Sequence, residues 1–140
     1  MDCEFPEQNA TSEEIAKILR ETKTIAVVGL SPKPERPSHS VSAYMQEQGY
    51  KIIPVNPGQK EILGEKAYGS VLDIPGPVDM VNIFREPTAV PEIVDQAIAK
   101  KAKVVWMQEG VVHNESAAKA RAAGLLVVMN KCLYKEHVRL

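Results

Sequence analysis

The chain has 140 residues, 17 of them basic and 18 acidic, and a formal net charge of −1 at pH 7. This length suits one domain that buries roughly two-thirds of its unfolded surface, and the balanced charge gives no general attraction to nucleic acid or to an anionic membrane. Two cysteines, Cys3 and Cys132, cannot build a disulfide framework. No apolar run reaches the roughly 18 residues of a membrane span, and the acidic amino terminus is unlike a signal peptide. We expect a reduced, cytoplasmic protein with a single domain over residues 1–140, of which residues 1–11 form a mobile extension.

The first two predicted elements are a helix and a strand. Thr11 and Glu14 have the spacing of a capping box, which predicts a helix from about residue 12 whose apolar face covers the sheet. Residues 24–28 follow as a β-branched and apolar run that closes at Gly29. Such a run is typical of a strand buried on both faces of a parallel sheet.

The loop after this strand departs from the dinucleotide-binding pattern. That pattern needs three spaced glycines, so that a pyrophosphate can approach the backbone and a helix can pack on the strand. Of the three, Gly29 alone is present, and the loop continues with three prolines together with Lys33, Arg36 and His39. Cations and hydroxyl groups ahead of a helix start offer a different way to hold phosphate. The loop therefore predicts a nucleotide-like ligand other than NAD.

The second strand, predicted for residues 50–55, ends in a second departure. An NAD-binding domain places Asp or Glu there to bind the ribose hydroxyl groups, whereas this chain has Asn56 and Pro57. Pro54 lies within the strand, which is tolerated at a strand end or beside an incompletely paired neighbour. Between the two strands, residues 38–48 are predicted to form a helix closed by a glycine.

The remainder of the chain alternates strands and helices. Residues 58–77 are rich in turns and hold at most one short strand, near residues 67–68. Three further strands are predicted, at residues 78–84, 103–107 and 125–129.

Three helices accompany these strands. Pro91 is expected in the first turn of one helix, and Asn114 is expected to cap an alanine-rich helix that follows. A short helix is predicted within residues 130–140, with Leu133 and Val138 packed against the core.

This alternation predicts an α/β fold, a doubly wound parallel sheet of about five strands in three layers, with right-handed crossovers. With the strands numbered along the chain, the expected order is 3-2-1-4-5. Ligands of such sheets bind outside the carboxyl ends of the strands, at the switch point. The loops that meet there are residues 29–40, 55–60, 84–87 and 108–111.

An ordered set of motifs over residues 13–137 resembles a known family. The motifs are Val28-Gly29-Leu30-Ser31 with Arg36-Pro37-Ser38, Ile53-Pro54-Val55-Asn56-Pro57, Ile62-Leu63-Gly64, Val78-Asp79 through Phe84-Arg85, Val105 through Val111, and Gly124 through Met129 leading to Cys132. The set resembles the small stand-alone members of the CoA-binding domain family, which are similar to the amino-terminal domain of the succinyl-CoA synthetase alpha subunit. The resemblance implies a Rossmann-like fold that binds coenzyme A or acyl-CoA.

The resemblance also implies where each part of coenzyme A lies. The expected neighbours of the diphosphate are Gly29, Leu30, Ser31, Arg36, Ser38, His39 and Ser40. Those of the adenosine are Val55, Asn56, Pro57, Ile83, Phe84 and Arg85, and those of the pantetheine arm are Gln108, Glu109 and Gly110. Basic residues such as Lys60 are expected to face the 3′-phosphate. The synthetases carry a glycine-rich first loop where this chain has prolines. They also need a second domain with a phosphorylated histidine, which this length does not accommodate, so ligase activity is not carried over.

Four of these side chains allow two interpretations. Arg36 is either a phosphate clamp or a solvated loop charge, and Arg85 is either a ligand contact or half of a surface ion pair. Asn56 either holds an adenosine edge or ends its strand by bonding its own backbone. Glu109 is either a catalytic carboxylate or, beside a glycine turn, a hydrogen-bond acceptor.

The sequence is compatible with two functions from different classes, and a third stays open. The first is a non-catalytic protein that binds coenzyme A or acyl-CoA, and the second is an NAD(P)-linked or acyl-transfer enzyme that uses Cys132 or Glu109. A regulatory subunit that senses metabolite level is the third. The first is favoured, because the glycine pattern and the ribose acid are missing and Cys132 with His137 has no third orienting group. The histidines and cysteines lack metal-ligand spacing. The expected partner is a small nucleotide, without nucleic acid or membrane, and a homo-oligomer or partner enzyme stays open.

Overall fold

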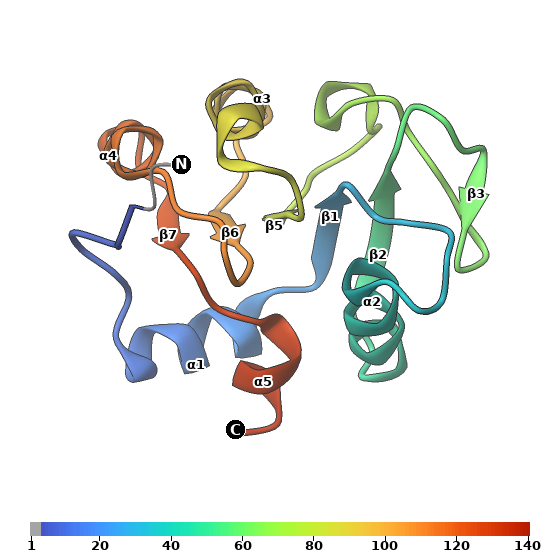
Figure 1. Cartoon of the computed structure of the whole chain (residues 1–140), viewed down its shortest axis with the longest axis horizontal. Coiled ribbons are helices and arrows are strands. Elements are labelled where there is room, and N and C mark those ends of the chain that lie inside the picture. The colour runs from blue at the N-terminus through green and yellow to red at the C-terminus, as the bar shows by residue number, and fades with distance from the viewer. Residues whose placement is uncertain (1–3) are drawn as a thin grey trace.

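Five parallel strands form the central sheet of the computed structural model, which describes residues 4–140. In spatial order they are β2 (Lys51–Val55), β1 (Thr24–Val28), β5 (Met80–Ile83), β6 (Val104–Met107) and β7 (Leu126–Val128). One face is covered by α3 (Val90–Ala99) and α4 (Asn114–Ala122), and the other by α1 (Ser12–Glu21), α2 (Pro37–Glu47) and α5 (Leu133–His137) (Figure 1). The predicted three-layer, doubly wound α/β fold is confirmed.

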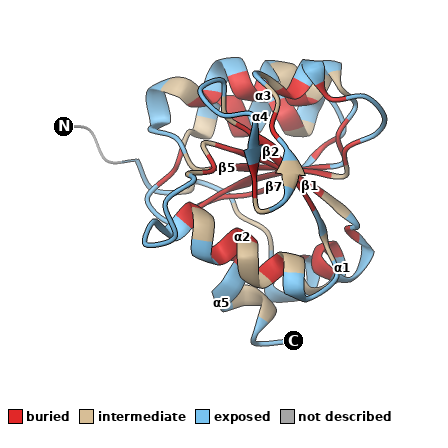
Figure 2. Ribbon diagram, turned by 90° about the vertical axis from the view of Figure 1, so that its right-hand side faces the viewer, coloured by how far each residue is buried: buried red, intermediate tan, exposed pale blue. Residues whose placement is uncertain are grey.

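The strands are largely buried, as their red colour in Figure 2 shows. Apolar side chains project from both faces of the sheet and form two clusters. Along β1, Ile25 and Val27 join the cluster under α1, α2 and α5, whereas Ala26 and Val28 join the cluster under α3 and α4. Trp106 is fully buried, and its indole N–H donates to the carbonyl oxygen of Lys131 at 2.8 Å. Within residues 4–140 no helix has the length and apolarity needed to cross a membrane.

The predicted strand order is wrong in one respect. The third of the five long strands, β5, pairs with β1 and not with β2. With only the long strands numbered along the chain, the order is therefore 2-1-3-4-5. The outer edge of β2 meets Tyr68 instead, whose N–H donates to Pro54 O at 3.0 Å and whose carbonyl accepts from Asn56 N–H at 2.9 Å. Pro54 thus turns its nitrogen toward a short neighbour, as expected from its missing hydrogen. A strand with proline at this position belongs at an edge of the sheet.

The turn-rich segment holds more structure than predicted. Besides the bridge at Tyr68, β3 (Glu61–Ile62) and β4 (Glu65–Lys66) form an antiparallel hairpin. Leu63 and Gly64 turn this hairpin with φ of 56° and 75°, so both residues of the two-residue loop have positive φ, which suits the twist of the hairpin. Short 3₁₀ helices follow at η1 (Val71–Asp73) and η2 (Pro87–Ala89).

Two predictions about helix ends are wrong and two are confirmed. His113, and not Asn114, caps α4, because its ring nitrogen accepts the N–H of Ser116 at 3.2 Å. Val138 is 53% exposed, since α5 ends one residue before it, although Leu133 is buried as predicted. The capping box that opens α1 and the proline in the first turn of α3 are both present.

The segment before α1 runs beside β7 and α4. The side-chain amide of Asn9 bonds both backbone groups of Met129, each at 2.9 Å. Glu7 N–H donates to Asn114 Oδ1 at 2.9 Å, which is where that asparagine is engaged. The mobility of residues 1–11 stays a prediction, and residues 1–3, with Cys3, lie outside the described residues.

Candidate functional site

The candidate site lies where the strand order reverses, between β1 and β5. The chain leaves β1 toward α2 on one face of the sheet and leaves β5 toward α3 on the other. Loops that part in this way leave a crevice at the carboxyl ends of the strands, which is the usual ligand position in such sheets. Gly29 and Phe84 sit on the two sides of this crevice, and Phe84 N–H donates to Val28 O at 2.9 Å.

Gly29 is required by the packing of the two strands. Its φ is +90°, and a Cβ built on it would lie 2.4 Å from the carbonyl oxygen of Phe84. No real side chain tolerates that distance, and residues other than glycine seldom adopt this φ. The single glycine kept from the dinucleotide pattern therefore has a structural role, whatever ligand is bound.

The loop from residue 29 to residue 40 is held by its own side chains. Ser31 N–H donates to Ser38 Oγ at 3.0 Å, and Lys33 N–H donates to Ser31 Oγ at 3.1 Å. His39 Nδ1 lies 2.9 Å from the carbonyl oxygen of Ser31 and must carry the hydrogen, because a carbonyl only accepts. Hydroxyl and imidazole groups that the sequence assigns to phosphate thus also fix the loop.

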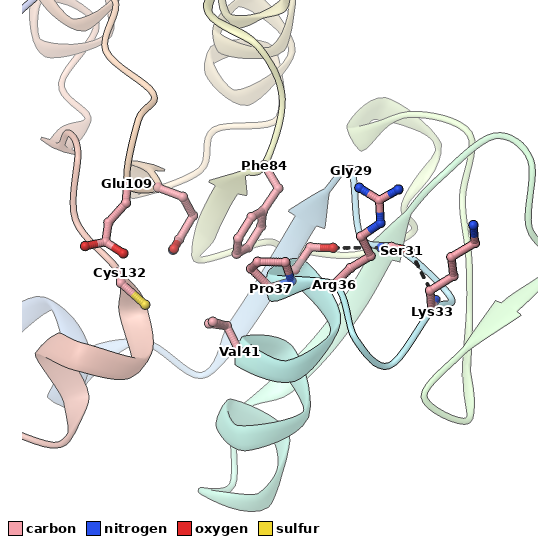
Figure 3. Close-up of a pocket in the computed structure, with 11 residues that line it drawn as sticks. Gly29, Ser31, Lys33, Arg36, Pro37, Val41, Phe84, Glu109 and Cys132 are labelled. Carbon is pink, nitrogen blue, oxygen red and sulfur yellow. Dashed lines mark hydrogen bonds between the residues drawn. The ribbon is translucent and has the colours of Figure 1, made fainter.

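A first cavity of about 510 Å³ opens between this loop, α2, the end of β6 and the start of α5. Figure 3 shows Lys33 and Arg36 at one side, Glu109 and Cys132 at the opposite side, and Phe84, Pro37 and Val41 between them. The lining is completed by Gly29, Ser31, Ser38 and Gln108. The cavity therefore has a cationic end, an apolar middle and an end with a thiol and a carboxylate.

The two cations at the first cavity are unpaired within residues 4–140. Neither the Arg36 guanidinium nor the Lys33 ammonium makes a hydrogen bond or ion pair with a described residue. Glu109 differs, because Lys135 Nζ lies 2.8 Å from its Oε2 and 3.1 Å from its Oε1. The hydrogen bond and the charge of Glu109 raise the pKa of Lys135. The carboxylate is thus half of an exposed ion pair, while the cations remain able to bind an anion.

A buried amide pair lies behind the first cavity. Gln108, which lines the cavity and is 3% exposed, donates from Nε2 to Asn82 Oδ1 at 3.0 Å. Asn82 is fully buried in β5, and its Nδ2 has no partner among the described residues. The sequence analysis did not single out Asn82, although an amide within an apolar strand is a visible signal.

A second cavity of about 380 Å³ lies across Gly29 from the first, between the ends of β2 and β5 and the helix α3. Its lining consists of Val28, Gly29, Val55, Asn56, Pro57, Gly69, Ser70, Arg85, Ala89, Glu92, Ile93 and Gln96. Asn56 ties the loops together, since its Nδ2 donates to Leu30 O at 3.0 Å and its Oδ1 accepts from Gly58 N–H at 2.9 Å. This geometry agrees with the strand-ending interpretation of Asn56.

The second cavity also contains a carboxylate that the sequence analysis missed. Glu92 of α3 lines it together with Asn56 and Pro57. No Asp or Glu directly follows the second strand in sequence, but α3 supplies one from 36 positions beyond Asn56. Arg85 lies in the same cavity and forms the surface ion pair that was one of its two interpretations, with Glu86 at 3.0 Å.

The predicted site residues divide into three groups. The first cavity brings together Gly29, Ser31, Arg36, Ser38, Phe84, Gln108 and Glu109. The second brings together Gly29, Val55, Asn56, Pro57 and Arg85. Neither of the two is lined by Leu30, His39, Ser40, Lys60, Ile83 or Gly110. Leu30 and Ile83 are fully buried, so neither presents any surface to a ligand in this structure. The ligand contacts of all these residues stay predictions.

The thiol-base interpretation has no support in the geometry. Cys132 is a free, buried thiol that lines the first cavity. His137 Nδ1 is engaged elsewhere, 2.8 Å from the hydroxyl oxygen of Tyr44. Within residues 4–140 no group of His, Cys, Asp and Glu side chains is arranged to hold a metal ion.

Fold and site together define a Rossmann-like α/β domain with a divided, partly cationic crevice at its switch point. The profile of the CoA binding domain family matches residues 23–138. The chain therefore belongs to the CoA-binding domain family, as its motifs predict.

Relatives of this chain occur as small proteins and as parts of larger ones. It is 44% identical over 130 residues to the uncharacterised protein YneT of Bacillus subtilis, covering 93% of this chain and 96% of that one. A hypothetical protein from Pyrococcus horikoshii OT3 has a structure that matches with a TM-score of 0.92 and 47% identity, over 100% of this chain and 99% of that chain. The alpha subunit of ADP-forming acetate–CoA ligase II from Pyrococcus furiosus is 45% identical over 109 residues, which cover 76% of this chain and 24% of the subunit.

Proposed function

We propose that this protein binds coenzyme A or acyl-CoA and has no catalytic activity of its own. The observation that carries the proposal is the pair of cavities that meet at Gly29 on the carboxyl edge of the sheet. A long ligand with a charged centre and two less charged ends matches this arrangement. Membership in the CoA-binding domain family supports the choice of coenzyme A among such ligands.

The charge distribution supports a diphosphate beside the first loop. Arg36 and Lys33 have no anionic partner within residues 4–140, and Arg36 stands at the N-cap of the eleven-residue helix α2. Helix amino termini attract anions through their unpaired N–H groups and the helix dipole. In the proposal the adenosine occupies the second cavity, and the pantetheine arm runs through the apolar middle of the first toward Gln108.

The proposed absence of catalysis rests on how the reactive side chains are engaged. Glu109 is paired with Lys135, and His137, the histidine nearest in sequence to Cys132, is bonded to Tyr44. A nucleophile needs a base within hydrogen-bond reach and a third group to orient that base.

One alternative has specific observations in its favour, an NAD(P)-linked or acyl-transfer enzyme of the same fold. Glu92 offers the second cavity a carboxylate of the kind that binds a ribose diol, and Cys132 offers the first cavity a thiol. Against the NAD reading stands the first loop, where prolines replace the glycines that admit a pyrophosphate to the backbone.

A melting series separates these functions. Coenzyme A at about 100 times its dissociation constant should stabilise the fold by roughly 2.7 kcal/mol. For a domain near this size the melting temperature should rise by roughly 5 to 15 °C. NAD should give much less at equal concentration, and dephospho-CoA should fall between the two, because it keeps the diphosphate and loses the 3′-phosphate. A series in which NAD equals or exceeds coenzyme A would reject the proposal in favour of the oxidoreductase.

The proposal includes a cytoplasmic setting and a small-molecule ligand as the main partner. The nearly neutral net charge supports the omission of nucleic acid and membrane surfaces as partners. A partner enzyme or a second copy of the chain is compatible with the same binding role.

A further inference from the structure

Arg85 lies at the junction of the two cavities. A Cβ built on Gly29 would lie 3.1 Å from Arg85 Cδ, so the stem of this arginine rests against the one residue that lines both cavities. Arg85 itself lines the second cavity. A ligand that extends from one cavity into the other must therefore pass beside the Arg85 side chain.

The Arg85 guanidinium is already engaged by its neighbour in sequence. Arg85 Nη2 donates to Glu86 Oε1 at 3.0 Å, and Arg85 Nε donates to Glu86 Oε2 at 3.3 Å. Arg85 uses two donors, which is the geometry that it would also offer to a phosphate group. Its hydrogen bonds and charge lower the pKa of Glu86, so this carboxylate stays ionised at neutral pH.

Glu86 has no second task that would explain the pair. It occupies the N-cap position of η2, but its side chain makes no capping hydrogen bond. Among the other described residues, its side chain bonds to Arg85 alone. The two side chains are 45% and 59% exposed, and exposed ion pairs are weak enough to exchange one anion for another.

We propose that Glu86 is an internal competitor for a ligand phosphate: it holds Arg85 in the empty site and releases it when a phosphate group of the ligand crosses Gly29. The inference rests on the proposed binding of coenzyme A. Arg36, which has no such competitor among the described residues, attracts the anion from the start, and Arg85 joins only a ligand whose phosphate displaces Glu86. Uncharged ligands cannot displace a carboxylate, so the affinity for pantetheine should not depend on Glu86.

The test measures dissociation constants by titration calorimetry at low salt for coenzyme A, dephospho-CoA and pantetheine. Glu86→Ala and Glu86→Gln should tighten the binding of coenzyme A, the former by about two- to fivefold, since the competing pair is exposed. Arg85→Ala should weaken it by about tenfold or more, the loss expected for hydrogen bonds to a charged group. In the Arg85→Ala background the Glu86→Ala substitution should have no effect.

A matched control removes an ion pair of similar exposure away from the crevice. Asp95→Asn breaks the contact between Asp95 Oδ1 and Lys119 Nζ, which joins α3 to α4 at 2.6 Å. This variant should leave all three dissociation constants unchanged. Melting temperatures of every variant establish that the fold is intact.

The ligands identify which phosphate Arg85 receives. Tighter binding of both coenzyme A and dephospho-CoA supports the competitor and assigns the diphosphate, and tighter binding of coenzyme A alone supports it and assigns the 3′-phosphate. Unchanged or weaker binding in Glu86→Ala would overturn the inference. So would a gain that persists without Arg85, because Glu86 would then act by repulsion alone. A wild-type protein that does not bind coenzyme A would overturn the proposed function, and this inference with it.

Discussion

Polar side chains are used in opposite ways at the two ends of the parallel strands. We call the side of the sheet where the strands begin its amino edge and the side where they end its carboxyl edge. At the amino edge, Asp79 is fully engaged: its carboxylate accepts the N–H groups of Lys23 and Thr24 at 2.9 and 3.1 Å. Asp79 N–H in turn donates to Thr24 Oγ at 2.9 Å, and Lys103 Nζ lies 3.6 Å from the carboxylate. These contacts fasten the start of β1 to the start of β5.

At the carboxyl edge, charged and polar groups remain without protein partners. The side chains of Arg36 and Lys33 are unpaired within residues 4–140, and the amide nitrogen of Asn82 is buried without a partner among them. A buried polar group without a partner is uncommon, so Asn82 marks a place where stability is given up for another purpose, whereas Lys33 and Arg36 are exposed and carry no such penalty. The contrast supports our proposal that the carboxyl edge serves a ligand, whereas the amino edge serves stability.

Gly29→Ala is the substitution with the largest expected effect. It tests the one residue at the carboxyl edge that the packing of β1 and β5 requires. We expect a loss of about 3 kcal/mol or more in the free energy of unfolding, since the new Cβ is both strained and in collision with Phe84 O. Urea denaturation measures the loss. Gly124→Ala is the control, because Gly124 has φ of +93° with nothing within 4 Å of its Cβ position. It should cost only about 1 to 2 kcal/mol. Equal losses at the two glycines would mean that the close approach of β1 and β5 is unimportant.

Arg36→Ala tests the carboxyl edge as a binding edge. It should weaken coenzyme A binding by roughly 1.5 to 3 kcal/mol, the value of hydrogen bonds to a charged group, while stability in urea stays unchanged. Titration calorimetry measures the affinity. Arg20→Ala is the matched control, since Arg20 lies exposed in the last turn of α1. Wild-type affinity in Arg36→Ala would remove this arginine from the site.

Asp79→Asn tests the amino edge as a stabilising edge. Partial burial raises the pKa of Asp79, but the N–H groups of Lys23 and Thr24 and the charge of Lys103 outweigh it and hold this pKa below the ordinary value. The ionised form therefore favours the folded state. At pH 7 the substitution should cost about 1 kcal/mol of unfolding free energy.

The lowered pKa of Asp79 predicts how the difference in unfolding free energy between wild type and Asp79→Asn changes with pH. A depressed pKa contributes stability above the ordinary pKa of Asp, about 4, and loses it as the pH falls through the lowered value. The gap between wild type and Asp79→Asn in urea denaturation should therefore be constant near neutrality and close in acid. A gap that widens below about pH 4 would contradict the assignment, and coenzyme A affinity at pH 7 should not change.

Most of the elements that stabilise the fold can be predicted from the sequence. Apolar runs bounded by turns predict the five strands, and local signals such as the Thr11 and Glu14 pair fix helix starts. The strand order was mispredicted because pairing is a long-range choice, although Pro54 carried the information that its strand lies at an edge. Asn114 was mispredicted because His113 competes for the same N–H groups.

The binding half is readable only in part. The cations of the loop from residue 29 to residue 40 can be seen in the sequence. Which of its polar groups form hydrogen bonds within the loop depends on how the chain folds. Glu92 enters the second cavity through the orientation of α3, which no local pattern around Asn56 indicates. The proposed competition between Glu86 and a ligand phosphate for Arg85 depends on where Gly29 lies, and hence on the order of the strands.

Cys132→Ser has the smallest expected effect and asks whether the carboxyl edge does anything besides bind. Serine keeps the shape of cysteine, and the thiol lines the first cavity at the end opposite Arg36, so we expect affinity for coenzyme A within about twofold of wild type, less than the loss of one hydrogen bond. Incubation of wild type and variant with acetyl-CoA, followed by chromatographic measurement of released thiol, should give the same background hydrolysis. Glu109→Gln serves as a second variant, because it removes the other reactive group at that end. An acyl-CoA hydrolase or transferase activity that disappears with either substitution would show that the protein is an enzyme. Oxidation of Cys132 would not show this, since a protein that only binds its ligand can also carry a modified thiol.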